Sequence, residues 1–462
     1  MSSESQALID SEGAGTLGRS EDEILGRTSG RWVHHWEPED QTFWESIGAR
    51  VAKRNLQFSI YAEFLGFSVW LLWSVIAVKL NDVGFAFSAD QLFWLVAIPS
   101  LVGALLRLPY TFAVPKFGGR NWTIISALLL VIPCLGLAWA VSHPSTPFWA
   151  MLLIAATAGF GGGNFASSMA NISFFYPEKE KGWALGLNAA GGNIGVAFVQ
   201  APFIISAIVV IGGGLTLARA GWVWLPFIAL AAFLAWKLMD NLSDAKADFA
   251  SSAKAAHRSN TWIMAFLYVG TFGSFIGFAA AFPLLIKTQF PDINALTFAF
   301  IGALVGSLIR PLGGRLADRF GGAIVTIFAF FVMTLGVLGA IWSISLKSFP
   351  LFLATFILLF ASTGIANGST YRMIPAIFQA KALIGGSSVM QARRESAAAI
   401  GIISAVGAFG GFLVPRTFAW STGTYGSMVP AFLAYTTLYL VMATVTWFFY
   451  KRPGSLLAEA GV

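Results

Sequence analysis

The chain is poor in the residues that most often carry chemistry in enzymes. Its 462 residues include one cysteine, Cys134, which falls in the third expected span, and four histidines. The histidines, which are His34, His35, His143 and His257, fall in expected tails or loops. A single cysteine forms no intramolecular disulfide, and scattered histidines without clustered acids or cysteines do not assemble a metal site. The sequence therefore predicts no catalytic residue, no metal ion and no cofactor, which argues against an enzyme.

Charge is scarce as well. Only 11% of the residues are charged, whereas 56% are hydrophobic, 48 are glycine and the mean hydropathy is +0.72. Such a chain is not a soluble globule, and its apolar stretches approach the ~20 residues that a membrane-spanning helix needs. We expect an all-α polytopic membrane protein with spans near residues 58–80, 91–115, 121–142, 147–175, 184–208, 222–240, 261–287, 296–317, 323–346, 350–379, 394–418 and 427–450.

Basic residues are distributed unevenly between the expected loops. With the N-terminus inside, most lysines and arginines outside the spans fall in inner loops, and the outer loops hold only Lys79, Arg219, Lys287, Lys347 and Arg416. This asymmetry satisfies the positive-inside rule with both termini cytoplasmic. The net charge of +7 therefore reflects membrane topology, and we expect contact with membrane lipid and no nucleic-acid partner.

Polar segments divide the chain into five parts. Residues 1–30 predict a disordered tail without a cleavable signal peptide, and residues 32–54 predict a short amphipathic element at the inner surface. The polar stretch 241–260 separates six spans from six. We therefore expect a cytoplasmic tail over 1–57, six-helix bundles over 58–240 and 261–450, a cytoplasmic linker over 241–260 and a second cytoplasmic tail over 451–462.

One heptapeptide occurs twice in related form. Leu101-Val-Gly-Ala-Leu-Leu-Arg107 resembles Leu304-Val-Gly-Ser-Leu-Ile-Arg310, and each arginine is followed ten residues later by Phe-Gly-Gly. If those glycines mark the turn at the membrane surface, a helical rise of about 1.5 Å per residue puts each arginine roughly 15 Å deep. An arginine keeps its charge there, so one arginine in each of two pseudo-symmetric halves predicts a central anion site. Both the depth and the repeat argue against arginines that merely reach the surface or pair with an acid.

Glycines crowd the fourth, fifth, tenth and eleventh expected spans, where small residues permit close helix contact. The runs beside Asn164 and Asn193 indicate close packing around a polar pocket. After the eighth span, Gly313-Gly-Arg-Leu-Ala-Asp-Arg-Phe-Gly321 resembles the loop signature of the major facilitator superfamily. That resemblance implies a gating loop with Gly314, Asp318 and Arg319, which connects neighbouring helices and the two bundles. The first half has Pro115 where the second has Asp318, so we expect uneven gating.

Longer stretches narrow this resemblance to one family. After residue 32 the chain is similar to nitrate/nitrite porters of the NarK type, in the stretches Trp36-Glu-Pro-Glu-Asp40, Asn164-Phe-Ala-Ser-Ser-Met-Ala-Asn-Ile-Ser-Phe-Phe-Tyr-Pro177, Ala184-Leu-Gly-Leu-Asn188, Gly192-Asn-Ile-Gly195 and Tyr268-Val-Gly-Thr-Phe-Gly-Ser-Phe275. The resemblance implies the major facilitator fold, the bacterial inner membrane and a role in nitrate assimilation. It also implies a substrate site made of Arg107, Arg310, Tyr268, Asn193, Phe67, Phe165 and Phe272.

Nitrate and nitrite suit these residue types. A guanidinium donates parallel hydrogen bonds to two oxygens of a flat monoanion, and phenyl rings above and below would exclude water. When the site is empty, two arginine charges repel, so closing the bundles around an anion is easier than closing them around nothing. We expect a monomeric secondary transporter that exchanges nitrate for nitrite by alternating access, with nitrate entering and nitrite leaving.

Glu63 supports a second hypothesis. It lies one turn before Phe67, and a shift of 205 residues pairs it with Tyr268, so it is expected to face the same passage. Antiporters of the resembled family lack an acid here, and a buried glutamate that binds and releases a proton would permit nitrate/proton symport. A salt bridge to an arginine or a solvated position would make Glu63 structural instead.

An anion channel is a further alternative, although the duplicated glycine-rich helices and the loop signature suit moving bundles better. Two other charged residues are expected to be structural. Arg372 in the tenth span and Glu395 at the start of the eleventh are expected to pair near the inner surface.

Overall fold

The structure, a computed structural model, describes residues 20–245, 249–386 and 388–459. Within this part of the chain, twelve helical segments are long and apolar enough to cross a membrane. They are Gln41–Ile76, Ala89–Thr111, Gly119–Val141, Phe148–Phe175, Glu178–Ile208, Arg219–Leu238, Ser259–Gln289, Ala295–Phe320, Gly322–Ser345, Phe349–Ile384, Arg394–Tyr425 and Val429–Tyr450. The predicted twelve spans are confirmed, although the first begins at Gln41 and not near residue 58.

Many spans of the first half consist of two helices in succession. The elements of this half are α2 (Glu21–Ile24), η1 (Ser29–Arg31), β1 (Trp32–Val33), α3 (Gln41–Phe43), η2 (Trp44–Gly48), α4 (Ala49–Trp70), α5 (Leu72–Ile76), η3 (Leu80–Val83), α6 (Ala89–Thr111), α7 (Ala113–Phe117), α8 (Gly119–Leu129), α9 (Val131–Val141), α10 (Phe148–Thr157), α11 (Gly159–Phe175), α12 (Glu178–Gln200), α13 (Ile205–Ile208), α14 (Arg219–Trp222), α15 (Leu225–Leu238) and β2 (Asn241–Leu242).

Longer uninterrupted helices make up most of the second half. Its elements are α16 (Phe249–His257), α17 (Ser259–Tyr268), η4 (Val269–Gly273), α18 (Ser274–Gln289), α19 (Ala295–Phe320), α20 (Gly322–Ser345), α21 (Phe349–Ile384), α22 (Val389–Ala408), α23 (Gly410–Tyr425), α24 (Val429–Tyr450) and α25 (Leu456–Glu459).

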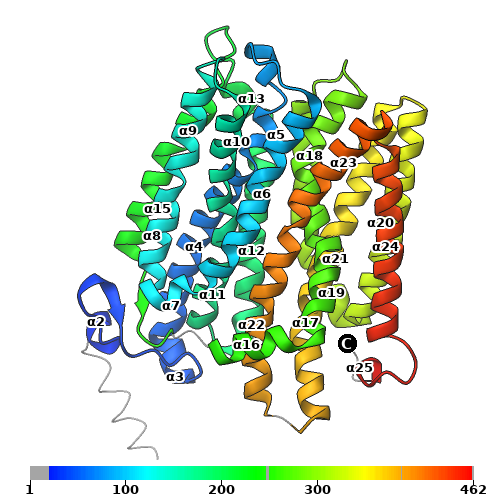
Figure 1. Cartoon of the computed structure of the whole chain (residues 1–462). Coiled ribbons are helices and arrows are strands. Elements are labelled where there is room, and N and C mark those ends of the chain that lie inside the picture. The colour runs from blue at the N-terminus through cyan, green and yellow to red at the C-terminus, as the bar shows by residue number, and fades with distance from the viewer. Residues whose placement is uncertain (1–19, 246–248, 387, 460–462) are drawn as a thin grey trace, which may run out of the picture.

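The two halves lie side by side with their long helices roughly parallel (Figure 1). The first half occupies the left of this view and the second half the right, and α16 runs along the lower end between them. The segment with α2 and the last helix, α25, also lie at the lower end. We call this the inner end, because it is the end that the sequence predicts to be cytoplasmic, and we call the opposite end the outer end.

Local sequence explains where several helices begin and turn. Asp40 caps α3 by accepting a hydrogen bond from the amide of Phe43, and Ser88 forms a capping box with Gln91 at the start of α6. The repeated Phe-Gly-Gly turns lie at the inner end, as predicted. Gly118 and Gly321 have φ angles of 85° and 88°, which a residue with a side chain rarely adopts.

The glycine runs bring helix backbones into contact around the centre of the first half. A Cβ atom on Gly161 of α11 would overlap the backbone of Gly66 on α4, and one on Gly162 would overlap the ring of Trp70. The second half contains a similar crossing, where a Cβ on Gly273 would approach the Cα of Gly410 to 2.9 Å. The predicted close packing is therefore confirmed at these crossings.

Residues 20–48 differ from what the sequence predicts. The expectation of a disordered tail over residues 1–30 is wrong for residues 20–30, which form ordered structure at the inner end, while residues 1–19 lie outside the described residues. Strand β1 pairs in parallel with β2, in the register Trp32↔Asn241 and Val33↔Leu242. Buried apolar residues of the same segment, among them Leu25, Val33 and Trp44, pack against the inner ends of α4 and α11.

The crossing of α4 and α11 predicts a strong effect of a single side chain. We expect Gly161→Val to lower the free energy of unfolding by about 1–3 kcal/mol or to prevent folding, because the new atoms overlap the Gly66 backbone. Gly186→Val on α12 is the matched control, because nothing lies within 4 Å of a Cβ there. Thermal unfolding in detergent measures both, and equal melting temperatures for the two variants would contradict the packing described here.

Candidate functional site

Two buried arginines lie at the interface of the halves. Arg107 on α6 is fully buried, and its Nε donates to the carbonyl of Gly162 at 3.2 Å. Its Nη1 donates to the carbonyl of Ser404 on α22 at 2.9 Å, so this side chain connects the first half to the second. Arg310 on α19 is 6% exposed, and the two guanidinium groups are close enough for their charges to interact.

Each arginine retains a buried nitrogen with no hydrogen-bond partner among the described residues. These atoms are Nη2 of Arg107 and Nη1 of Arg310. A buried donor without an acceptor costs roughly 1–3 kcal/mol, and more when it is charged. In the described part of the chain, neither arginine forms an ion pair. Two cationic donors without acceptors fit a site that an oxyanion completes.

Aromatic rings surround the guanidinium of Arg107. Its Cζ lies 4.5 Å from the ring centre of Phe165 and 5.0 Å from that of Phe272. These two rings are nearly parallel, with centres 6.2 Å apart and 23° between their planes. Phe67 lies 6.1 Å from Phe165, so the three predicted phenylalanines form one group. The rings exclude water and interact with the cation through their faces.

Tyrosines complete the other side of the group. Tyr268 is fully buried and stacks on Phe272, with ring centres 5.4 Å apart. Its hydroxyl lies beside the Arg310 guanidinium without a well-aligned hydrogen bond among the described residues. Tyr371 on α21 lies 6.3 Å from Tyr268 and 5.5 Å from the Arg310 Cζ. The structure thus brings together Arg107, Arg310, Tyr268, Phe67, Phe165 and Phe272.

Asn193 is the predicted site residue with the weakest connection to this group. Its side chain on α12 is buried, and its amide oxygen has no hydrogen-bond partner in the described part of the chain. It directly follows Gly192, where a Cβ would come within 2.8 Å of the Glu63 carboxylate. Asn193 therefore lies next to the surroundings of Glu63 and has an unpaired polar atom.

Glu63 lies within a buried polar network of the first half. The Asn188 amide donates to its Oε2 at 3.0 Å, and the same amide donates to the Ser168 hydroxyl at 2.6 Å. Ser168 in turn lies 3.0 Å from the hydroxyl of Ser59. The Glu63 Oε1 has no partner among the described residues, and its charge is within range of both arginines. The predicted alternative of a solvated position is wrong, since Glu63 is fully buried.

The predicted gating loop connects two helices of the second half. Asp318 on α19 forms an ion pair with Arg372 on α21, 2.5 Å apart, and both side chains are about half exposed. A Cβ atom on Gly368 of α21 would come within 2.9 Å of the Gly314 amide nitrogen on α19, and Arg319 lies over the ring of Phe320. The predicted Arg372–Glu395 pair is wrong, because Arg372 contacts Asp318, and Glu395 pairs with Arg258 at 3.0 Å.

Ion pairs between the halves lie at the outer end in the described part of the chain. Arg416 on α23 contacts Asp90 on α6 at 2.9 Å and lies 4.0 Å from the ring of Trp94. Lys287 on α18 contacts Asp82 at 3.5 Å. Deeper, Gln200 donates to the carbonyl of Ala279 at 2.7 Å. The described ion pairs at the inner end connect residues of the same half, so the arrangement is one in which the outer end is closed.

Five contributors to the site were missed by sequence reasoning. Trp70 contacts Arg107 and lies three residues after Phe67, so helical spacing could have indicated it. Asn188 and Ser168 are polar residues inside expected spans, which is also a usable signal. Tyr371 and the Ser404 carbonyl gave none, because only the packing of distant helices brings them to the arginines.

Known proteins are similar in sequence to this chain over most of its length. The sequence profile of the Major Facilitator Superfamily matches residues 59–391. The nitrate/nitrite transporter NarU of Salmonella typhimurium is 44% identical over 443 residues, which cover 90% of this chain and 96% of that protein. The probable nitrate/nitrite antiporter NarK2 of Thermus thermophilus is 36% identical, covering 94% of this chain and 99% of that protein. The chain belongs to the nitrate/nitrite porters of the Major Facilitator Superfamily.

A solved structure supports the same fold. The D-xylose-proton symporter has a TM-score of 0.64 to this chain at 15% identity, and the match covers 86% of this chain and 97% of that one. The predicted major facilitator fold is confirmed. Family membership also makes the chain a transporter and not an enzyme, and its twelve apolar helices and bacterial relatives make it a multi-pass protein of the bacterial inner membrane.

Proposed function

We propose that this porter carries nitrate and nitrite by alternating access and that it exchanges one for the other, with nitrate entering and nitrite leaving. The observation that carries the proposal is the pair of buried arginines, each with an unpaired nitrogen, together with the nearly parallel rings of Phe165 and Phe272 beside Arg107. Arg107, Arg310 and the Tyr268 hydroxyl are donors suited to the oxygens of a small flat monoanion. The names of the relatives point to the same two anions.

The charge of the empty site explains why exchange is favoured. Two guanidinium charges several ångströms apart repel by a few kcal/mol at an effective dielectric constant of about 20. An anion between them removes this repulsion and lets the halves close around the site. Return of the empty carrier is therefore slower than return of the loaded one. We propose that the Asp318–Arg372 pair then stabilises α19 against α21 at the inner end during the cycle.

Glu63 favours a second candidate function, nitrate/proton symport. Its carboxylate lies within electrostatic range of Arg107 on α6, Arg310 on α19 and Tyr371 on α21. The two arginines alone give the empty site a net charge of +2. An ionised Glu63 lowers this net charge to +1, and a bound anion lowers it to zero. The empty carrier then returns more easily, and proton binding at the unpaired Oε1 could accompany the anion. Exchange is the first candidate, because both arginines retain unpaired donors in the presence of Glu63.

Substitution of the arginines tests the site. We expect Arg107→Lys and Arg310→Lys each to lower the rate of nitrate exchange in proteoliposomes about tenfold or more, because an ammonium cannot replace a planar fork that donates to two oxygens. Arg315→Lys is the matched control, since Arg315 lies exposed on the same helix as Arg310. Equal rates for Arg310→Lys and Arg315→Lys would refute the assignment.

Fluxes through the wild-type protein and Glu63→Gln separate the candidate functions. We expect uptake of isotope-labelled nitrate to need internal nitrite or nitrate and to be insensitive to an imposed pH gradient. Uptake without internal anion that follows the pH gradient in the wild type and loses this dependence in Glu63→Gln would establish symport instead. Uptake that needs neither internal anion nor gradient and does not saturate would indicate a channel and contradict both.

A further inference from the structure

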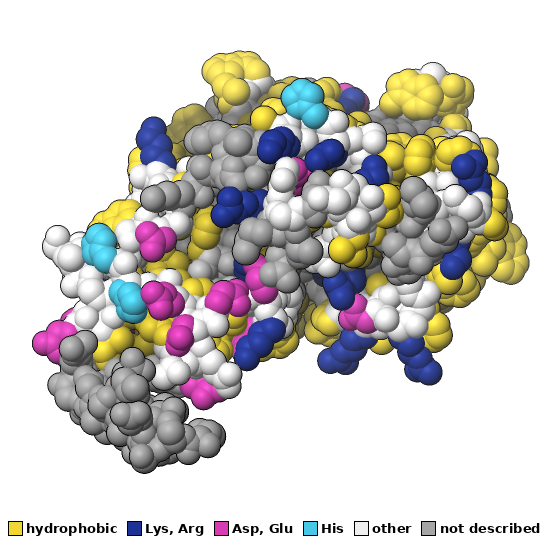
Figure 2. Space-filling model, turned by 90° about the horizontal axis from the view of Figure 1, so that it is seen from below, with side chains coloured by type: hydrophobic (Ala, Val, Ile, Leu, Met, Phe, Trp, Pro, Cys, Tyr) yellow, Lys and Arg dark blue, Asp and Glu magenta, His cyan; other side chains and the backbone are white. Residues whose placement is uncertain are grey.

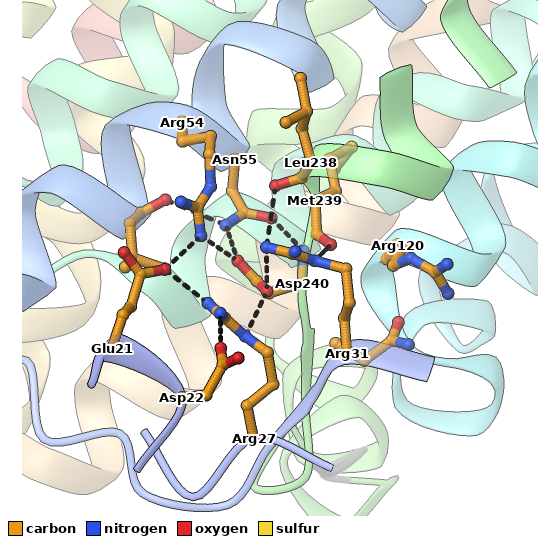
Figure 3. Close-up of polar contacts among 12 residues, drawn as sticks. Glu21, Asp22, Arg27, Arg31, Arg54, Asn55, Arg120, Leu238, Met239 and Asp240 are labelled. Carbon is orange, nitrogen blue, oxygen red and sulfur yellow. Dashed lines mark hydrogen bonds and ion pairs between the residues drawn. The ribbon is translucent and has the colours of Figure 1, made fainter. Parts of the chain in front are cut away.

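A fully buried aspartate lies at the inner end, directly after the last span of the first half. Asp240 follows α15, and its Oδ1 contacts Arg27 at 3.1 Å and Arg31 at 2.9 Å. Its Oδ2 contacts Arg54 on α4 at 2.9 Å and the Asn55 amide at 3.2 Å. Figure 3 shows these side chains converging on Asp240 from the N-terminal segment and from α4. Such a carboxylate is stable only while its cationic partners stay in place.

The N-terminal segment binds the chain beyond Asp240 as well. We call residues 20–33 the N-terminal clasp. Its strand β1 pairs with β2, and the amide of Ser243 donates to the carbonyl of Val33 at 3.0 Å. Leu242 and Ala245 are buried in the same apolar cluster as Leu25 and Val33. Residues 241–245, which the sequence assigns to the linker, are therefore fixed to the first half.

The clasp also connects helices at the inner end of the first half, where the ion pair found in the second half is missing from the described residues. In the second half, Asp318 and Arg372 connect helices at the inner turn, but the first half has Pro115 at the corresponding position. There Arg120, just after the turn, donates to the carbonyl of Trp236 at 2.7 Å and to that of Gly30 in the clasp at 3.1 Å. The inner ends of the first, third and sixth spans are thus joined through residues 27–31.

On the other side of the linker, α16 belongs to the second half. Arg258, directly after α16, pairs with Glu395 on α22 at 3.0 Å, and the hydroxyl of Thr261 donates to the carbonyl of Ala255 at 2.6 Å. Ala255 itself is fully buried.

Figure 2, which views the inner end, shows acidic side chains gathered toward the lower left and basic side chains spread over the remaining surface.

We infer that the N-terminal clasp is a conformational device that shortens the connection between the two halves and so limits how far their inner ends separate. With the clasp closed, four Cα steps connect Ala245 to Phe249, which span at most about 14 Å. With the clasp open, eleven steps connect Leu238 to Phe249, which span up to about 38 Å. The inference goes beyond the identity of the anion, because it concerns only the range of the bundle motion.

At neutral pH the Glu21 carboxylate is ionised and pairs with Arg27 of the clasp and Arg54 of α4. Burial alone would raise the pKa of Glu21, but hydrogen bonds from Arg27 and Arg54 hold that pKa below its ordinary value of 4.5. The stabilisation that Glu21 gives is therefore complete above pH 4.5 and is lost as the pH falls through its lowered pKa. Measurements near pH 7 therefore keep the contribution of Glu21 to the clasp intact in the wild type.

Distance measurements between spin labels test the inference. Labels on Trp183→Cys and Leu383→Cys, at exposed inner ends of α12 and α21, are used in a Cys134→Ser background. We expect the distance distribution to shift to longer values in Asp240→Asn. We expect the same shift when six Gly and Ser residues are inserted after Ala245, which lengthens the linker with the clasp intact. The same insertion after Gly213 in an outer loop is the control and should change nothing.

An unchanged distribution after the Ala245 insertion would overturn the inference, and this result is informative even if Asp240→Asn fails to fold. A second measurement uses the strand register. In an Asp240→Asn, Cys134→Ser background we expect nitrate exchange to slow several-fold, and a disulfide between Val33→Cys and Leu242→Cys to restore the rate reversibly. Failure of the disulfide to restore the rate would also contradict the clasp. The distances between the spin labels do not depend on which anion is transported, so they test this inference separately from the proposed function.

Discussion

The repulsion between two permanently charged guanidinium groups is the constraint on which the rest of this structure depends. Arg107 and Arg310 are buried at the interface of the halves, and no acid in the described residues forms an ion pair with either of them. Their charges are balanced in part by carbonyls, aromatic faces and the more distant Glu63. The glycine crossings on α4 and α11 make this possible, because they bring the Gly162 carbonyl and the phenyl rings close to Arg107. This arrangement is the basis of our proposal that an anion completes the site.

Polar contacts elsewhere follow the division of the chain into two halves. Contacts that cross the interface, such as Arg416–Asp90 and Gln200 with Ala279, lie toward the outer end. Those at the inner end stay within one half, as Asp318–Arg372 and the pairs around Asp240 do. Contacts of the first kind must break when the outer end opens, whereas those of the second kind persist when each half moves as a rigid body. The N-terminal clasp belongs to the second kind and also fixes the start of the linker.

The sequence predicts features that depend on composition and on internal repetition. The spans follow from apolar length, the arginine pair from the repeated heptapeptide, and the turns at Gly118 and Gly321 from glycine. It does not predict contacts that tertiary structure alone creates. Asp240 meets Arg27 across more than 200 residues, and polar composition made residues 20–30 resemble a disordered tail. Arg372 and Glu395 looked like partners because both lie near the inner surface, yet Arg372 pairs with Asp318 on α19, and Glu395 pairs with Arg258 between α16 and α17.

A structure determined with nitrate bound tests the central claim most directly. The account predicts density for one flat anion between the rings of Phe165 and Phe272. Its oxygens should lie within hydrogen-bonding distance, about 2.7–3.2 Å, of Nη2 of Arg107 and Nη1 of Arg310. Nitrate bound elsewhere while both nitrogens stay unpaired, or guanidinium groups that do not share a chamber, would contradict the account.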